Sequence, residues 1–216
     1  MRKFGIIGYP VAHSLSPELF RKAYGGRWEY VLIEEPDFNT ALSRFLQDDD
    51  LCAVNVTAPF KVDAATVAAI KAPEVELCGA ANILIKEGEG LKAHNSDFFA
   101  VLSLLDSLDG DVAVVGFGGA GRAAFAASQA LGKKTRVLHH DELRDPLKED
   151  IIIYTLPGAV EGYSNMECRA LLEANYKDPV CRNLPGVDWY MGGELWLKAQ
   201  AVSGWRLMTG TEPEIQ

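Results

Sequence analysis

One segment restricts the fold more than any other: residues 112–121 pass from four apolar residues directly into a glycine-rich turn. Gly116, Gly118 and Gly121 have the spacing GxGxxG, and the residues after them, to about 131, have the period of a helix. Glycines placed in this way permit a tight turn and a close approach of backbone to phosphate, so the segment favours binding of a dinucleotide. The alternative is that the glycines only turn the chain between a strand and a helix.

Short apolar runs alternate with segments of helical period along the chain, which predicts an α/β protein with parallel strands joined by helices. Strands are expected at 4–8, 28–33, 51–56, 79–86, 91–94, 112–115, 135–139, 151–155 and 189–191, and helices at 16–25, 38–46, 61–70, 97–108, 120–131 and 194–204. The Glu-Gly-Glu-Gly turn predicts a hairpin between the fourth and fifth strands. Ser16 is expected to cap the first helix and Gly204 to lie near the end of the last. The segment 158–185 is the least readable part of the chain.

The strand and helix pattern restarts after Gly110, which suggests two domains in the 216 residues. We expect an N-terminal α/β domain over residues 1–100 and a dinucleotide-binding domain over 101–192, with the C-terminal helices at about 193–216 packing back on the first. Only residues 143–150 separate the His-His-Asp turn at 139–141 from the predicted strand at 151–155. That is too short for a helix and a further strand, so the dinucleotide-binding domain is expected to be abbreviated.

Composition excludes several classes of protein. A formal net charge of −9 with no basic cluster disfavours nucleic-acid binding. The N-terminus has no signal-like apolar region, and no stretch reaches the roughly 20 apolar residues of a membrane helix, so a cytoplasmic protein without a membrane partner is expected. The histidines have no spacing typical of a metal site. The four cysteines form no CxxC pair and are expected to be reduced: Cys52, Cys78, Cys168 and Cys181.

Polar residues follow several of the predicted strands. In open α/β sheets, ligands bind beyond the carboxyl ends of the strands, so these residues are candidates for a binding site. Ser14 and Ser16 suit a carboxylate, although a turn and a helix cap would use the same residues. Lys61 lies near a helix N-terminus, where a cation is unfavourable, and this placement hints at a role beyond stability. Asn82 lies in an apolar stretch and needs hydrogen-bond partners. Asp97, taken alone, is an ordinary acidic residue in a first helical turn.

The residues after the strand at 135–139 bear on the choice of dinucleotide. Asp141 lies about 20 residues beyond the glycines, where an acid accepts a hydrogen bond from the ribose of NAD. A 2′-phosphate, as in NADP, would instead need Arg136 or Arg144, with His139 or His140 contributing if protonated. The residues alone leave both cofactors open.

Five motifs, taken in order, resemble the shikimate dehydrogenase family, also called shikimate 5-dehydrogenase. They are His-Ser-Leu-Ser-Pro at 13–17, Asn-Val-Thr-Ala-Pro-Phe-Lys at 55–61, Gly-Ala-Ala-Asn at 79–82, Asn-Ser-Asp at 95–97 and Gly-Phe-Gly-Gly-Ala-Gly-Arg at 116–122. Gln-Ala at 200–201 and Thr-Gly at 209–210 fit the family's closing pattern. The resemblance covers nearly the whole chain.

The resemblance implies an N-terminal α/β substrate domain with a mixed sheet and a Rossmann-like domain. It implies NADP(H)-linked, reversible reduction of 3-dehydroshikimate to shikimate in aromatic amino acid biosynthesis, with Lys61 and Asp97 as the catalytic pair. The substrate would be bound by Ser14, Ser16, Thr57, Asn82, Tyr176 and Gln200. The cofactor, NADP with NAD possible, would be bound by Gly116, Gly118, Gly119, Ala120, Gly121, Arg122, His139, His140, Asp141 and Gly193.

The sequence also departs from the family. His139, His140 and Asp141 replace the family's Asn-Arg-Thr phosphate-binding run, and the nucleotide domain is short. Two alternatives therefore stay open: a quinate/shikimate dehydrogenase that uses NAD, and a catalytically inactive regulator that binds shikimate. The presence of both Lys61 and Asp97 argues against the regulator, because a pure binder would not need both. The oligomeric state is open between a monomer and a homodimer.

Overall fold

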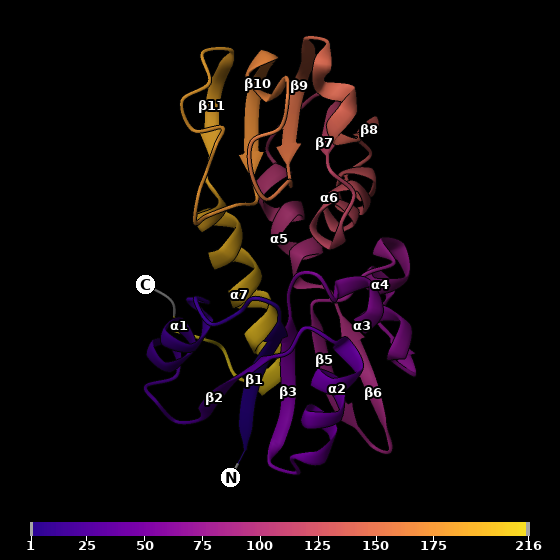
Figure 1. Cartoon of the computed structure of the whole chain (residues 1–216), viewed down its shortest axis with the longest axis vertical. Helices are drawn as coiled ribbons and strands as arrows, with labels where there is room; N and C mark the ends of the chain where they lie inside the picture. The colour runs from indigo at the N-terminus through magenta and orange to yellow at the C-terminus, as the bar shows by residue number, and fades with distance from the viewer. Residues whose placement is uncertain (1, 215–216) are drawn as a thin grey trace. The chain divides into compact units, whose positions relative to one another are not determined.

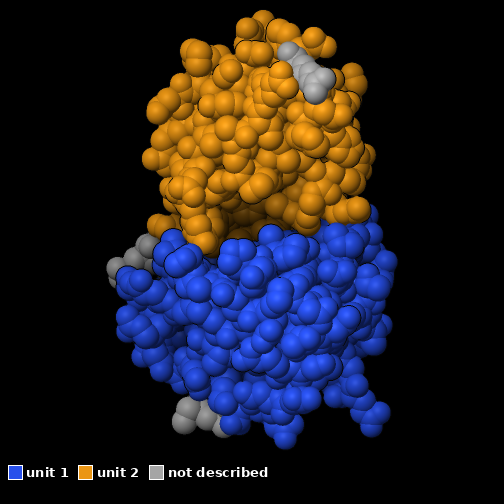
Figure 2. All heavy atoms as spheres, in the orientation of Figure 1, with its two compact units in different colours: residues 1–96, 201–216 blue, residues 97–200 orange. Residues whose placement is uncertain are grey.

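The computed structural model describes residues 2–214, and of Arg144 only the backbone. The chain divides into two compact units, drawn in different colours in Figure 2: unit 1 comprises residues 1–96 and 201–216, and unit 2 comprises residues 97–200. All four cysteines are free, as the sequence predicts. No helix in the described part of the chain is long and apolar enough to cross a membrane.

Unit 1 is built on a mixed six-stranded sheet with the strand order β2-β1-β3-β5-β6-β4 (Figure 1). β1 pairs in parallel with β2 and β3, β5 is antiparallel to β3 and β6, and the short β4 pairs in parallel with β6. The mixed sheet is the one expected from the sequence. Its strands are β1 (Lys3–Gly8), β2 (Glu29–Glu34), β3 (Leu51–Val56), β4 (Ile70–Lys71), β5 (Ile83–Glu87) and β6 (Gly90–His94).

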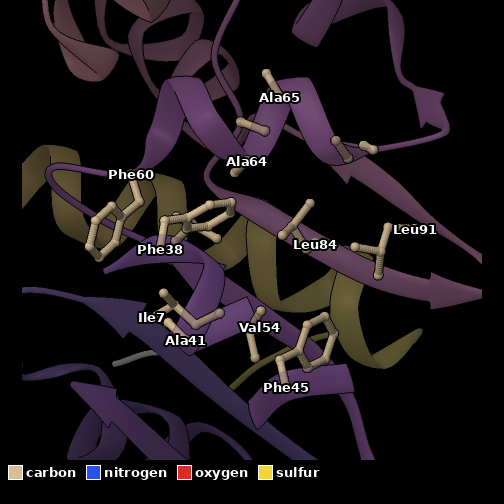
Figure 3. Close-up of a cluster of buried hydrophobic side chains, with 14 of the residues drawn as sticks. Ile7, Phe38, Ala41, Phe45, Val54, Phe60, Ala64, Ala65, Leu84 and Leu91 are labelled. Carbon is tan, nitrogen blue, oxygen red and sulfur yellow. The ribbon is translucent and has the colours of Figure 1, made fainter. Parts of the chain in front are cut away.

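Apolar side chains cover both faces of this sheet. On one face Ile7, Val54 and Leu84 pack with Phe38 and Phe45 of α2 in a continuous cluster (Figure 3). On the other face a second cluster forms around Phe4, Phe20 and Trp205. The central strands β1 and β3 are thus buried on both sides, whereas the outer strands β2 and β4 are largely exposed. The helices of unit 1 are α1 (Ser16–Ala23), α2 (Phe38–Gln47), α3 (Lys61–Val67) and α4 (Pro73–Cys78).

Unit 2 is built on a five-stranded, all-parallel sheet with the order β11-β10-β9-β7-β8. α6 connects β7 to β8, as the glycine-rich segment predicts, but a five-residue 3-10 helix, η1 (His140–Arg144), lies between β8 and β9. The strands are β7 (Val112–Val115), β8 (Thr135–Leu138), β9 (Leu147–Tyr154), β10 (Met166–Glu173) and β11 (Val187–Met191), and the helices are α5 (Ser96–Leu105), α6 (Gly119–Ala130) and α7 (Gly193–Thr209). α5 and α7 cross the boundary between the units. The fold is therefore the predicted α/β class with an abbreviated Rossmann-like sheet.

Loops cover one face of the parallel sheet where a full crossover would place a helix. Buried Val115, Ile152 and Leu171 on this face pack with partly buried loop residues such as Val160 and Leu184. Each such side chain contributes about 1.5–3 kcal/mol when fully withdrawn from water, so loop residues can replace a helix in covering the sheet. Because these loop residues shield the sheet from water, the short connection after β8 is compatible with a buried apolar core.

The sequence-based predictions were wrong in five places. β10 and α4 were missed, and the helix beginning at Lys61 ends at Val67, so that β4 can form where helix was expected. Ser16 is the first helical residue of α1 and not its cap, which is Leu15. Gly204 does not end α7, which continues to Thr209. An added Cβ at Gly204 would lie 2.8 Å from the Ser96 hydroxyl, so this glycine serves close packing.

Candidate active site

The carboxyl ends of β1 and β3 lie at the same edge of the unit 1 sheet, because the two strands are parallel neighbours. β5 runs in the opposite direction, so that its start, Ile83, pairs with Asn55 near the end of β3 and with His94 at the end of β6. Four chain segments therefore meet at one sheet edge. Five of the predicted site residues lie in the segments that follow β1 and β3 or precede β5 at this edge: Ser14, Ser16, Thr57, Lys61 and Asn82.

Two serines follow β1 at this edge. The Ser14 hydroxyl accepts a hydrogen bond from the Ser16 amide at 3.2 Å, and Ser16 is buried and hydrogen-bonded to the Tyr30 hydroxyl. Glu34 fixes the same loop from β2, because its carboxylate accepts the amides of Val11, at 2.6 Å, and of the next residue. Ser14 thus accepts the first amide of α1, although the N-cap position itself is Leu15, and the Ser16 hydroxyl is held by Tyr30.

Thr57 and Lys61 occupy the turn and first helical position after β3. The Thr57 amide donates to the Ile7 carbonyl at 2.9 Å, and the Lys61 carbonyl accepts the Ala81 amide at 2.7 Å. Asn82 is 3% exposed, and its side-chain oxygen accepts the Ser96 amide at 2.7 Å. Asn82 thus acts as an acceptor for the first amide of α5. The expectation that this buried amide has partners is met.

A buried carboxylate that the sequence analysis did not identify supports the segment before Asp97. Glu74, on α4, bonds to His94 Nδ1 at 2.9 Å and accepts the Asn95 amide at 3.3 Å. The Asn95 side chain in turn donates to the Ala80 carbonyl at 2.8 Å. Burial alone would raise the pKa of Glu74, but these hydrogen bonds outweigh it and hold the pKa below its usual range. The turn at 94–96 is therefore fixed on both its backbone and its side chains.

Asp97, the first residue of unit 2, is buried with 4% of its surface exposed. Its Oδ1 accepts a hydrogen bond from the indole nitrogen of Trp196, on α7, at 2.8 Å. A buried carboxylate needs such donors, because an uncompensated charge is costly in a low-dielectric interior. This contact could not be predicted from local sequence, because the two residues lie 99 positions apart.

Tyr176 lies on a loop that is fixed by a third buried carboxylate, Glu173. Glu173 is 0% exposed, and it accepts the Val180 amide at 2.7 Å and the Tyr190 hydroxyl at 2.6 Å. Burial raises the pKa of the half-buried Tyr176. Gly193 packs against the same loop: an added Cβ there would lie 2.7 Å from the Tyr176 amide nitrogen. The glycine was predicted to bind cofactor, and its observed environment is this close backbone contact.

The glycine-rich turn has the geometry that its three glycines require. Gly116 has a φ of +91°, and a Cβ at Gly121 would lie 2.1 Å from the Gly116 carbonyl oxygen. A Cβ at Gly118 would meet nothing within 4 Å, so backbone is exposed at this point. The next two residues, Gly119 and Ala120, begin α6, whose first amides have no partners within the helix. The turn can hold a pyrophosphate through these amides.

Arg122 gives a second indication of anion binding at this turn. Its guanidinium lies over the ring of Phe117, 4.8 Å from the centroid, in the first turns of α6. Among the side chains that the structure describes, its Nε is the one buried nitrogen or oxygen without a hydrogen-bond partner. A cation is unfavourable at a helix N-terminus unless an anion joins it. The residues present at this turn therefore fit a phosphate-bearing cofactor.

The predicted ribose end of the nucleotide site is exposed. His139, His140 and Asp141 follow β8 and lie at the surface, and the His139 amide donates to the Glu142 carboxylate at 2.7 Å. Arg136, one of two arginines considered for a 2′-phosphate, is paired with Glu149 at 2.5 Å. The side chain of the other, Arg144, lies outside the described residues. Gln200, on α7, is half-buried.

Comparison with known proteins agrees with these motifs. Residues 6–84 match the family model described as the shikimate dehydrogenase substrate binding domain. The NADP(+) shikimate dehydrogenase of Halobacterium salinarum is 37% identical over 161 residues, which cover 70% of this chain and 60% of that protein. The chain belongs to the shikimate dehydrogenase family. Its aligned part spans about 60% of the length of the relatives from Haloarcula marismortui and Halobacterium salinarum.

Other family members align over almost the whole chain. The NADP(+) shikimate dehydrogenase of Anaeromyxobacter dehalogenans is 29% identical over 237 aligned positions, which cover 97% of this chain and 85% of that protein. The crystal structure of shikimate 5-dehydrogenase from Thermus thermophilus in complex with shikimate superposes with a TM-score of 0.84 at 25% identity, covering 99% of this chain and 95% of that one. Both units of the chain are thus covered by the family likeness.

Proposed function

We propose that this protein is a shikimate dehydrogenase that catalyses the reversible, NADP-linked interconversion of 3-dehydroshikimate and shikimate. The observation that carries the proposal is the convergence of Ser14, Ser16, Thr57, Lys61 and Asn82 at one edge of the unit 1 sheet, in a chain that belongs to this family. Hydroxyls, an amide and an ammonium are the groups that recognise a small polyhydroxylated carboxylic acid.

In this proposal each polar group has a part in binding the substrate. The hydroxyls of Ser14 and Ser16 donate to the substrate carboxylate, with Tyr176 assisting. Thr57 and Asn82 bind the ring hydroxyls, and Gln200 joins them. The fixed contacts of Asn82 support its role, because a polar group that is already held in place loses less entropy on binding.

Lys61 and Asp97 carry the proton chemistry in the proposed mechanism. Oxidation of an alcohol removes a proton from its oxygen as hydride leaves its carbon, and reduction returns that proton. The Lys61 amine accepts the proton in oxidation and its ammonium donates it in reduction, while its positive charge stabilises the developing oxyanion. The Asp97 carboxylate orients the reacting groups.

NADP(H), when bound, supplies the hydride chemistry at its nicotinamide. The first amides of α6 and the Arg122 guanidinium hold the pyrophosphate in this proposal. His139, His140 and Asp141 lie where the adenosine ribose is expected. NADP is favoured by the names of the relatives, although these three residues leave NAD as a second possibility. A cytoplasmic location and a monomer or homodimer fit a biosynthetic enzyme of this kind.

Absorbance at 340 nm tests the proposal. The purified protein is mixed with shikimate and either NADP or NAD, and with quinate in parallel. Formation of reduced cofactor with shikimate and NADP is the expected result. Preference for NAD, or for quinate, would instead favour the quinate/shikimate dehydrogenase.

If no reduced cofactor forms with shikimate or quinate and either NADP or NAD, the proposed activity is contradicted. Shikimate binding measured by calorimetry then identifies the regulator, because a regulator retains the substrate site without turnover.

A further inference from the structure

Trp196 and Asp97 form a buried pair whose chemistry is asymmetric. Each residue is 4% exposed, and the indole nitrogen lies 2.8 Å from Asp97 Oδ1. An indole N–H can only donate, and an ionised carboxylate can only accept. The indole is therefore the donor, and Asp97 Oδ1 is the acceptor.

This hydrogen bond restricts the rotation of the carboxylate. The terminal torsion of an aspartate is broad and roughly two-fold, so an unrestrained carboxylate exchanges its two oxygens. A large aromatic ring packed in the interior has little freedom of its own. Its N–H therefore holds Oδ1 in one position and thereby sets where Oδ2 points.

We infer that Trp196 is a positioning residue for Asp97: its indole holds Oδ1, so that Oδ2 is the oxygen that acts on the reacting groups. The inference rests on the proposed function, in which Asp97 orients the proton transfer. It assigns to Trp196 an effect on turnover rather than on substrate affinity, because the indole contacts the carboxylate and is not among the proposed substrate ligands.

Trp196→Phe tests the inference with a small change in shape. Phenylalanine keeps an aromatic ring in the interior but has no N–H to donate. The kcat of shikimate oxidation is expected to fall about ten-fold, the size of effect typical of one hydrogen bond to a charged group, while KM stays within about two-fold.

Trp205→Phe is the matched control. Trp205 lies on the same helix, is 1% exposed, and also donates its indole N–H to a buried oxygen, Asn55 Oδ1, at 3.1 Å. Asn55 Oδ1 keeps the Tyr30 hydroxyl as a donor at 2.8 Å after the substitution. We expect this variant to lose a similar amount of thermal stability and to retain the kcat of the wild type.

A double-mutant cycle separates positioning from a general loss of structure. If Trp196 acts through Asp97, Trp196→Phe has no further effect on kcat when Asp97 is already replaced by alanine. Asp97→Asn replaces that background if the alanine variant does not fold. Three results would overturn the inference. They are losses in kcat that add in the cycle, a wild-type kcat in Trp196→Phe, and a loss of kcat in Trp205→Phe as large as that in Trp196→Phe. A wild type without turnover contradicts the proposed function itself, which distinguishes the two failures.

Discussion

Replacement of Lys61 by alanine is expected to lower the kcat of shikimate oxidation by a factor of about 100 or more. In the proposed mechanism the variant loses both the proton acceptor and the positive charge that stabilises the oxyanion, whereas the hydroxyl and amide groups proposed to hold the substrate remain. KM for shikimate should therefore change only modestly. Steady-state kinetics at 340 nm, with substrate and cofactor varied separately, measure both parameters.

Two further variants sharpen the test of Lys61. Lys61→Arg keeps the charge but cannot exchange a proton near neutral pH, so it should be nearly as slow as the alanine variant. Lys71→Ala, at an exposed position on β4, should keep the wild-type rate. An alanine variant at position 61 with unchanged kcat would contradict the assignment, and full activity of Lys61→Arg would reduce the role of Lys61 to that of a charge.

Gly118→Ala is expected to raise the KM for the dinucleotide at least about ten-fold without unfolding the protein. A Cβ at Gly118 meets nothing within 4 Å, and φ at this residue is −73°, which alanine adopts easily. The methyl group would instead occupy the space into which the pyrophosphate must approach the backbone. Thermal melting and cofactor titration measure the two effects independently.

Gly90→Ala provides the control for this prediction, because a Cβ there meets only Ala69 at 3.4 Å, an ordinary contact. Both variants should melt close to the wild type. Gly121→Ala should behave differently: its Cβ would lie 2.1 Å from the Gly116 carbonyl oxygen, so the turn itself must move and stability must fall. Wild-type cofactor affinity in Gly118→Ala would exclude the turn as the pyrophosphate site.

The parts of the fold that were predictable are those in which local pattern and tertiary environment agree. The strand at Leu51–Val56 was predicted to the residue, because an apolar run ends there in Thr-Ala-Pro. β10 was missed because Glu167 and Arg169 interrupt its first half with exposed charges, so that its apolar character becomes continuous only at Ala170. Its place in the sheet depends on pairing with β9 and β11, which are distant in sequence.

The candidate site was predictable to a similar degree. Ser14 can be identified because it follows a readable strand, and Asn82 because it is a polar residue in an apolar stretch. The directions of the strands then bring both residues to one edge of the sheet. Glu74 and Trp196 could not be identified, because a glutamate in a first helical turn and a tryptophan on an apolar helix are ordinary features. Their importance arises from partners far along the chain, His94 and Asp97, that local sequence does not specify.

The central claim is that this protein transfers a hydride between shikimate and a nicotinamide cofactor. Shikimate carrying deuterium on the carbon whose hydroxyl is oxidised tests it most directly, with mass spectrometry of the cofactor after incubation with NADP and with NAD. Our account predicts reduced cofactor that carries the deuterium. Reduced cofactor without the label, or none with either dinucleotide, would contradict it.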